Sequence, residues 1–348
     1  MRTKILGSIL VVLTVLGGIQ LFQNMTHKEQ FGDSDDFTVN MGEGEHSRII
    51  SKVRAKLDRI ESSRERDSEV MIEKTFNVNQ GDDLVINIAH ADVDIITGNG
   101  SEASVVVTLN SSNSDRARAR FEDMKWEVYQ EGGAVYVKAE SPRSNWSFNG
   151  SLNISVLITV PEAFNVELQT SHGDVNLADI QGKVSLLTSH GDVDFGGIKG
   201  ERISIQSSHG DISGQSLTSS QVDVETSHAD IEIGEVDAKS FSAATSHANI
   251  SIKRIVGEAD ITTSHGSIRV FLAGNESATL STEHGDIDIS MDANAGADLD
   301  FEAPDIQMDR NFKVNGENGA ERVAGSINGG GRRIQARTTH GSIEMNNQ

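Results

Sequence analysis

Seven histidines recur at a nearly constant spacing, and their type and pattern make them the best candidates for chemistry in this chain. The step from one to the next is constant to within a single position, with a period of about 19 residues. Each histidine stands in a short phrase such as Thr188-Ser189-His190-Gly191-Asp192. An imidazole can act as a general base, a metal ligand or a pH-sensitive charge. The seven are His172, His190, His209, His228, His247, His265 and His284.

The phrase contains serine, histidine and aspartate, the residue types of a hydrolytic triad. Triad members meet in space from distant chain positions, whereas neighbours along a strand point to opposite faces. Seven copies also favour a building device over an active site, which is normally built once. We therefore expect no catalytic residues, no cofactor and a protein that is not an enzyme.

A short fixed period predicts a solenoid in which each repeat stacks on the next. Stacking would place the seven histidines in a structural ladder with one ring per turn, about 4.8 Å apart. Flanking carboxylates leave binding of Zn²⁺ or Cu²⁺ as the alternative. A linear ladder does not readily form a closed tetrahedral set, so we assign no metal site. The sequence does not decide whether the rings face inward or outward.

Apolar residues between the phrases predict the strands that position the histidines. Val175 and Leu177 alternate with a polar residue, as do Val184 and Leu186, and Ile180 lies between the two pairs. The same pattern recurs in every repeat, so like side chains stack on like. The column that begins at Val175 continues with Val193, Ile212, Ile231, Ile250, Ile268 and Ile287.

The predicted fold class is all-β, a parallel β-helix with turns of about 19 residues. We expect a right-handed coil, because the six-residue sub-repeat of the left-handed form is missing. Residues 73–161 are less periodic and predict an irregular β capping region, with a short helix from Ser114 to Met124. Residues 162–348 are predicted to form the regular β-helix.

The N-terminal residues predict export. Arg2 and Lys4 precede an apolar stretch, so residues 1–22 are read as a signal peptide or an N-terminal membrane anchor. Residues 23–72 are predicted to be a polar linker and an amphipathic helix, which would place a short helix before the β region. That helix, at 47–68, would pack on the first strands, contact a partner or lie on a membrane surface. We expect the remainder in the periplasm or at the cell surface.

The amino-acid composition limits the classes of molecule that this chain can bind. The chain has no cysteine, which excludes disulfides and lipid attachment through a thiol. Its formal net charge is −22, and the excess of acidic residues lies after residue 70. An acidic body repels nucleic acid and anionic lipid, so we expect no nucleic-acid partner and membrane contact only through the N-terminal segment.

The repeat weakens near the C-terminus. Ala303 to Ile306 and Ala324 to Ile327 read as the next two turns, and Thr339 to Ile343 restores the phrase. His340 lies three steps of the period beyond His284. The predicted last turn is close to the chain end and has no obvious cap, so we expect end-to-end self-association to be possible.

Both tryptophans and both tyrosines lie in one short segment, at Trp126, Tyr129, Tyr136 and Trp146. Aromatic rings could stack on sugar rings and form a glycan site. They could equally form the core of the capping region, because alternate strand positions are buried.

Several local patterns together resemble the DUF4097 family of bacterial exported β-strand repeat proteins, which are labelled adhesins. They are an apolar N-terminus, the start at Phe76-Asn77-Val78, an early His90-Ala91-Asp92-Val93, Val160-Pro161, and repeats such as Gly173-Asp174-Val175. The resemblance covers about residues 73 to 345. It implies a β-helix in the cell envelope and no defined activity.

The sequence therefore predicts a non-enzymatic cell-envelope protein that acts as an adhesion or binding surface. An envelope protein or a glycan would be its partner. A regulatory or scaffolding protein that uses the coil as a docking platform is the second interpretation, and a metal-binding histidine ladder is the third.

Overall fold

The computed structural model describes residues 68–110, 114–140 and 153–347, which belong to one compact unit, Glu43–Gln348. Within these ranges all strands join one 24-stranded sheet, and α3 (Ser114–Asp123) is the one helix. The predicted leader at 1–22 and linker lie outside the described residues. So does the predicted helix at 47–68, except that Ser68 opens a strand. The all-β solenoid is confirmed, and its handedness stays a prediction.

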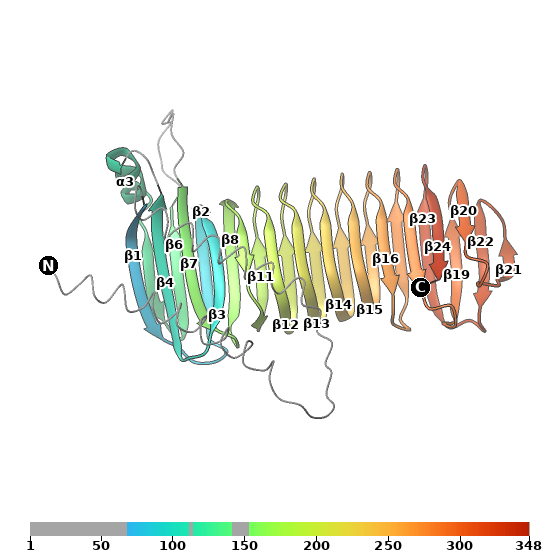
Figure 1. The fold of residues 1–348 in the computed structure, drawn as a ribbon, viewed down its shortest axis with the longest axis horizontal. Coiled ribbons are helices and arrows are strands. Elements are labelled where there is room, and N and C mark those ends of the chain that lie inside the picture. The colour runs from blue at the N-terminus through green and yellow to red at the C-terminus, as the bar shows by residue number, and fades with distance from the viewer. Residues whose placement is uncertain (1–67, 111–113, 141–152, 348) are drawn as a thin grey trace, which may run out of the picture. The chain divides into compact units, whose positions relative to one another are not determined.

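The middle of the solenoid consists of parallel rungs that follow one another in sequence order (Figure 1). Each rung pairs with the rung one repeat later in the sequence, as in Ile212↔Ile231 and Ile231↔Ile250. The strands are β8 (Asn165–His172), β9 (Val175–Leu177), β10 (Ile180–Gln181), β11 (Val184–Leu187), β12 (Val193–Gln206), β13 (Ile212–Glu225), β14 (Ile231–Ala244), β15 (Ile250–Thr262), β16 (Ile268–Leu272), β17 (Ala278–Thr282) and β18 (Ile287–Met291).

The core is the set of stacked apolar columns that the sequence predicts. Ile212, Ile231 and Ile250 are at most 1% exposed, and their neighbours in the same column are equally buried. Where Gly214 interrupts a column, the ring of Phe195 from the preceding rung occupies the space. A Cβ built on Gly214 would lie 1.9 Å from a ring carbon of Phe195.

At the N-terminal end the rungs are interleaved. The strands are β1 (Ser68–Asn77), β2 (Asp83–His90), β3 (Asp92–Gly98), β4 (Glu102–Asn110), β5 (Glu127–Glu131), β6 (Ala134–Ala139) and β7 (Asn153–Pro161). β2 pairs in parallel with β6 on one side and β8 on the other, and β3 lies likewise between β7 and β9. An early segment thus fits between two later ones, and the rung pattern begins well before residue 162.

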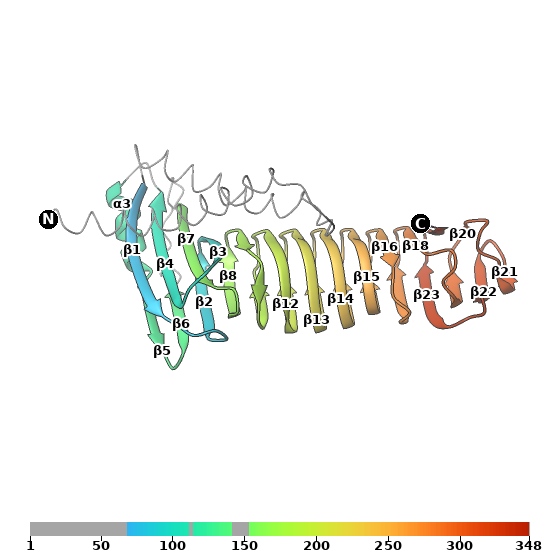
Figure 2. The ribbon, with the colours of Figure 1, turned by 60° about the horizontal axis from the view of Figure 1, so that its bottom comes forward.

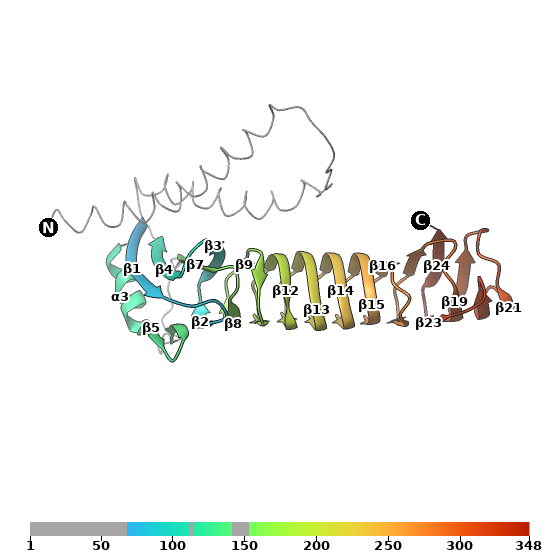
Figure 3. The same cartoon turned by 90° about the horizontal axis from the view of Figure 1, so that it is seen from below.

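Antiparallel strands close this end. β4 runs antiparallel to β7, β1 antiparallel to β4, and β5 antiparallel to β6. The turn between β5 and β6 uses Gly132 and Gly133, both in the left-handed region (φ 60° and 81°) that a tight hairpin needs. α3, β1 and β5 lie at the same end of the row (Figure 3).

The C-terminal end differs from the order that the repeat predicted. The strands are β19 (Ala297–Glu302), β20 (Asp305–Met308), β21 (Asn315–Asn318), β22 (Arg322–Ile327), β23 (Arg332–Thr338) and β24 (Ser342–Asn347). β23 pairs in parallel with β17 and β19, and β24 with β18 and β20. The last strands of the chain therefore lie inside the row and not at its tip (Figures 1 and 2).

This arrangement corrects two expectations. Residues 303–306 and 324–327 do not form successive parallel turns, because β22 runs antiparallel to β19 and β21 antiparallel to β22. The end also carries a cap, formed by β21 and β22. The period of the repeat measures distance along the chain. It cannot show that β23 and β24, which come last in the sequence, lie in space between β17–β18 and β19–β20.

Candidate binding surface

The structure brings all nine histidines of the described residues into one continuous row, called here the histidine row. Eight ring-to-ring contacts join them, with centroids 4.6–4.9 Å apart. Seven of these pairs are parallel within 5°, and only His90–His172 is tilted, by 34°. The members are His90, His172, His190, His209, His228, His247, His265, His284 and His340.

The row faces solvent. Every member is exposed except His90, which is half-buried. Eight steps of about 4.8 Å make a strip roughly 38 Å long. The open question of whether the rings point in or out is thereby answered for the described histidines.

The corner of each rung explains this direction. The threonine or serine two residues before the histidine is buried, as at Thr188 and Thr282. In the rung of Thr282, its hydroxyl donates to the carbonyl of Gly266 on the preceding rung (2.9 Å) and accepts from the N–H of Gly285 (3.2 Å). The chain bends at residues 283–285, directly after this inward hydroxyl, so the alternation of a straight strand ends there and His284 lies exposed to solvent.

The position after the histidine is crowded. A Cβ on Gly191 would lie 1.8 Å from the carbonyl oxygen of Gly173, and Gly285 would clash similarly. Neither glycine has a positive φ, so close approach between rungs favours glycine here. Ala229 and Ala248 occupy the equivalent positions of two other rungs. At those rungs the backbone must therefore lie slightly differently.

A second row of side chains runs beside the histidine row. Its member in each rung lies two residues after the histidine in the sequence. The Oδ1 of Asp192 accepts a hydrogen bond from the backbone N–H of Asp211 (2.9 Å), and Asp211 accepts one from Asp230 (3.0 Å). Each of these side chains therefore bonds the backbone of the next rung. This row, called here the carboxylate row, has six aspartates and, at three rungs, the uncharged residues Asn249, Ser267 and Ser342; its aspartates are Asp92, Asp174, Asp192, Asp211, Asp230 and Asp286.

The imidazoles have a defined orientation at two rungs. Nδ1 of His265 lies 3.4 Å from the carbonyl oxygen of Ser246, and Nδ1 of His340 lies 3.3 Å from that of Glu283. A carbonyl only accepts, so Nδ1 is the protonated nitrogen when this bond forms. Nε2, on the far side of the ring, is then an acceptor or a ligand that faces outward.

The geometry does not prearrange a metal centre. In the described residues no group of three or more histidine, aspartate or glutamate side chains is placed to hold a metal ion. Two neighbouring rings could share an ion only if their nitrogens came within about 4.2 Å, twice a Zn–N bond. The rings are 4.6–4.9 Å apart, so their side chains would have to turn toward each other.

His90 has a distinct environment. Burial lowers its pKa, and the nearby charges of His172 and Arg120 lower it further. His90 ends β2, at the interleaved N-terminal end, whereas the middle members of the row are solvated.

The predicted aromatic group does not form a single platform. Trp126 packs against the core and stacks on Phe121 with centroids 5.1 Å apart. Tyr129 and Tyr136 form a separate half-buried pair, with centroids 4.9 Å apart. The ammonium of Lys138 lies 4.5 Å from the Tyr136 ring centroid, and its hydrogen bond to the Tyr129 hydroxyl raises the pKa of Lys138. Trp146 lies outside the described residues.

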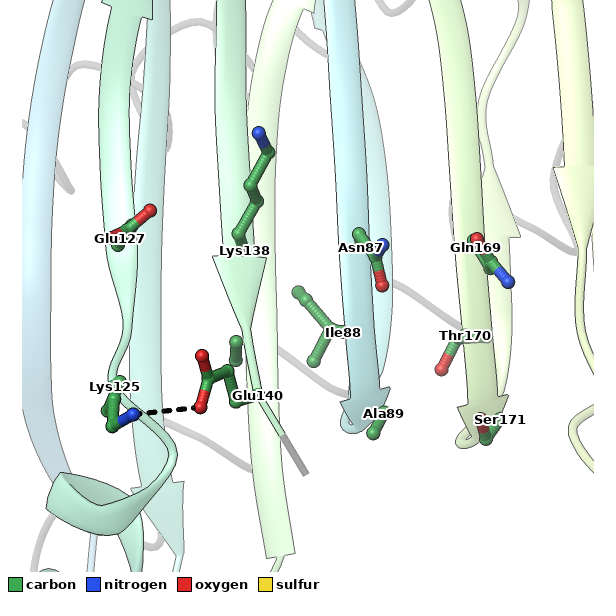
Figure 4. Close-up of a pocket in the computed structure, with 11 residues that line it drawn as sticks. Asn87, Ile88, Ala89, Lys125, Glu127, Lys138, Glu140, Gln169, Thr170 and Ser171 are labelled. Atoms are coloured by element: carbon green, nitrogen blue, oxygen red, sulfur yellow. Dashed lines mark hydrogen bonds and ion pairs between the residues drawn. The ribbon is translucent and has the colours of Figure 1, made fainter. Parts of the chain in front are cut away.

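A hollow of about 470 Å³ lies beside this pair, over β2, β5, β6 and β8 (Figure 4). Its lining is mainly polar and includes Asn87, Lys138 and Gln169, and Lys125 and Glu140 form an ion pair across its floor (3.0 Å). Because its lining is mainly polar, it lacks the apolar enclosure typical of small-molecule sites.

Two members of the histidine row were missed by sequence reasoning. The phrases around His90 and His340 are visible in the sequence. Both lie far along the chain from the regular repeats, so the sequence did not show that these two histidines stack on the ends of the row. His340 is three repeat lengths from His284 along the chain and yet stacks directly on it at 4.6 Å.

A model of the Toastrack DUF4097 family matches residues 82–346, a range that begins just before β2 and ends within β24. The chain belongs to the DUF4097 family. The match spans the histidine row and most strands of both interleaved ends. A search of the curated proteins finds no match.

Solved structures are similar to this DUF4097 chain at low sequence identity. One is a "putative adhesin" from Parabacteroides merdae ATCC 43184, 8% identical over 81% of this chain and 97% of that chain, with a TM-score of 0.42. A "putative adhesin" from Bacteroides fragilis NCTC 9343 is 12% identical over 80% and 97%, with a TM-score of 0.39. A "putative lipid binding protein" from Parabacteroides distasonis ATCC 8503 is 11% identical over 81% and 97%, with a TM-score of 0.32. Among the described residues of this chain, no helix has the length and apolarity needed to cross a membrane.

Proposed function

We propose that this DUF4097 protein is a non-catalytic binding protein of the cell envelope, and that the histidine row is its contact surface. The observation that carries the proposal is the strip of nine imidazoles, eight of them exposed, repeated at each rung. The carboxylate row repeats beside it at the same spacing. The apolar leader at residues 1–22 is the sequence feature that supports export.

A repeating strip suits a repeating partner. A linear polymer can make the same contact at each rung, and many weak contacts in register add up to high avidity. The net charge of −22 disfavours anionic polymers, whereas a neutral glycan can exchange hydrogen bonds with imidazole nitrogens. The proposed partner is therefore a neutral, linear polysaccharide of the envelope or of a surface to which the cell adheres.

The test is a pull-down of the full chain with insoluble chitin, cellulose and curdlan. The variant His209→Asn, His228→Asn, His247→Asn interrupts the row at its centre and should lose roughly ten-fold or more in retention. The control is Lys199→Asn, Thr218→Asn, Asp237→Asn, a row of exposed residues that are paired partners on β12, β13 and β14. Equal retention of both variants and the wild type would remove the histidine row from the proposal.

The experiment also separates adhesion from docking. The coil serves as a docking platform if two results are found together. None of the polysaccharides retains the protein, and an envelope protein is captured equally by the wild type and the histidine variant. Fractionation of cells, with the protein followed in the envelope and soluble fractions, tests the proposed location.

Metal binding is a second candidate, and the orientation of His265 and His340 favours it. Their Nδ1 atoms face backbone carbonyls, which leaves Nε2 outward with its lone pair available. Neutral imidazoles bind Zn²⁺ and Ni²⁺, so binding should weaken as the pH falls. Calorimetric titration with ZnCl₂ at pH 7.5 should show several weak sites in the wild type and fewer in the variant His265→Asn, His284→Asn, His340→Asn, which changes three consecutive rings of the row. Equal heats from this variant and the wild type would exclude these rings as the metal site.

A further inference from the structure

The final rung of the chain is inserted into a slot built entirely from earlier residues. β17 and β18 form one wall of this slot, and β19 and β20 form the other. Without residues 332–347 the two walls would be about 9.6 Å apart, two strand spacings, and each would present an unpaired strand edge. Such an edge is a template for pairing with an extended segment.

The slot makes specific demands on the strand pair that fills it. The guanidinium of Arg332 is buried and donates to the backbone carbonyls of Leu272 (3.2 Å) and Gly274. Thr338 donates to the carbonyl of Gly285 (2.8 Å). At position 341 a Cβ would lie 1.9 Å from that same carbonyl oxygen, so a glycine belongs there.

The apolar and outward positions of the slot are equally defined. Ile334, Ala336, Ile343 and Met345 are fully buried and continue the inward columns. On the outer face, His340 stacks on His284 and thereby joins the histidine row. The sequence of residues 332–345 therefore matches the slot in its buried apolar side chains, its hydrogen bonds to the walls and its stacked histidine.

A short glycine-rich tether joins this rung to the cap. Asn328, Gly329, Gly330 and Gly331 lie between β22 and β23, with φ values of 50°, 90°, 79° and 141°. Asn328 is held by hydrogen bonds from its side chain to the carbonyls of Ala293 and Ala295, whereas the three glycines after it can change direction because glycine adopts either sign of φ. The tether is therefore suited to act as a hinge.

We propose that the slot is a strand-acceptor site, and that it takes residues 332–347 of a second copy of this chain in exchange for its own. Exchange would reproduce every contact of the rung and change only the tether, which is the condition under which identical elements are swapped between protomers. At low concentration the chain's own rung is favoured by its tether, and exchange grows with protein concentration. The partner is thus a second copy linked through its C-terminal rung.

The experiment uses two full-length single-cysteine variants, Ser281→Cys and Arg337→Cys. These residues are paired Cα partners on β17 and β23, both outward-facing, and the chain has no cysteine of its own. The two reduced proteins are mixed at high concentration, held overnight in mild urea, returned to buffer and oxidised. Exchange predicts a heterodimer joined by the 281–337 disulfide, identified by mass spectrometry.

The matched control is the pair Asp223→Cys and Ser242→Cys, which are Cα partners on the middle strands β13 and β14. The proposal predicts roughly ten-fold more heterodimer from the test pair than from the control pair. A single chain carrying both Ser281→Cys and Arg337→Cys should close an internal disulfide and, once closed, should no longer exchange.

Equal yields from the test and control pairs, with the double variant closing normally, would overturn the proposal. So would concentration-dependent dimerisation of the internally locked chain, measured by light scattering, because a locked chain cannot release its rung and its contact would not involve the slot.

Discussion

The middle rungs and the two ends of the solenoid obey different rules of assembly. In the middle, each rung stacks on the one that precedes it in the sequence, as β13 stacks on β12 and β14 on β13. At the ends, β2–β3 is inserted between later strands, and β23–β24 between earlier ones. Both ends place antiparallel strands outside the inserted rung.

The difference shows how a repeat chain can stop. A plain stack would end on an open strand edge, which invites aggregation. An inserted rung ties the outer strands to the body through contacts between distant parts of the chain, and these close late because long loops must form first. The middle should therefore behave as a local, cooperative stack, and the ends as long-range closures that can open by themselves.

The largest expected effect comes from breaking the middle. Ile231→Asp places an uncompensated carboxylate in a column where the side chain is 1% exposed, which costs several kcal/mol. Because rungs depend on their neighbours, several turns should unfold together. Circular dichroism and urea melts measure the loss. Glu232→Lys, at the exposed neighbouring position, should change stability by less than about 0.5 kcal/mol. Similar losses from both would overturn the inward and outward assignment.

A second break tests how tightly the middle is packed. Gly214→Val forces a side chain into the space of the Phe195 ring, 1.9 Å from a Cβ at this site, and should cost about 1–3 kcal/mol. The double variant Phe195→Val, Gly214→Val should lose less than the sum of the two single changes, because the two residues share one volume. Additive losses in urea melts would show that the pair does not compensate.

These packing relationships mark how far the sequence could predict the structure. The columns through Ile212, Ile231 and Ile250 and the central histidines were predictable, because there the period in sequence equals the period in space. The insertion of β23 was not, because the length of chain between His284 and His340 does not say which rung His340 meets. The hydrogen bond that Asp211 accepts from the backbone N–H of Asp230 on the next rung was not predictable either, since the sequence shows a suitable acceptor and not its donor.

The inserted C-terminal strands β23 and β24 should open while the middle rungs stay folded. Arg332→Met keeps the bulk of a buried side chain but leaves the carbonyls of Leu272 and Gly274 without their donor, at a cost of about 1–3 kcal/mol. Hydrogen exchange should show faster opening of β23 and β24 and unchanged protection of β13 and β14. Arg337→Met, at an exposed ion pair on the same strand, should have little effect. Uniform loss of protection along the chain would mean that the ends and the middle are one cooperative unit.

A smaller change probes the bonds between middle rungs. Asp211→Ala removes the acceptor for the N–H of Asp230 and should cost about 1 kcal/mol. Asp211→Asn should restore most of it, because Asn249 plays the same part for Ser267 in another rung. Thermal melts compare the three proteins. If Asn is as damaging as Ala, the negative charge and not the hydrogen bond is what stabilises the row.

The smallest expected effect is a loss of stability in acid, and it should differ between the N-terminal and C-terminal ends of the solenoid. Burial lowers the pKa of His90, with further lowering from His172 and Arg120, so the unfolded chain binds this proton more readily. The contribution of His90 to stability is full above its unfolded pKa of about 6.5 and falls as the pH drops from there toward the folded value.

Asp300 at the C-terminal end responds to stronger acid. Burial alone would raise its pKa, but hydrogen bonds from Arg333 and Gln335 and the charges of Arg322 and Arg337 lower it overall. Its contribution is full above the unfolded pKa of about 3.9 and is lost as the pH falls through the folded value.

The N-terminal end should therefore loosen first as the pH falls. Hydrogen exchange at pH 7.5 and pH 5, corrected for intrinsic rates, should show faster opening of β2 and β3 at pH 5 and no change in β23 and β24. His90→Asn should remove that difference while leaving the rest of the histidine row intact. If both ends loosen together between these pH values, or if the Asn variant keeps the response, then His90 does not control the N-terminal closure and acid acts on the solenoid as a whole.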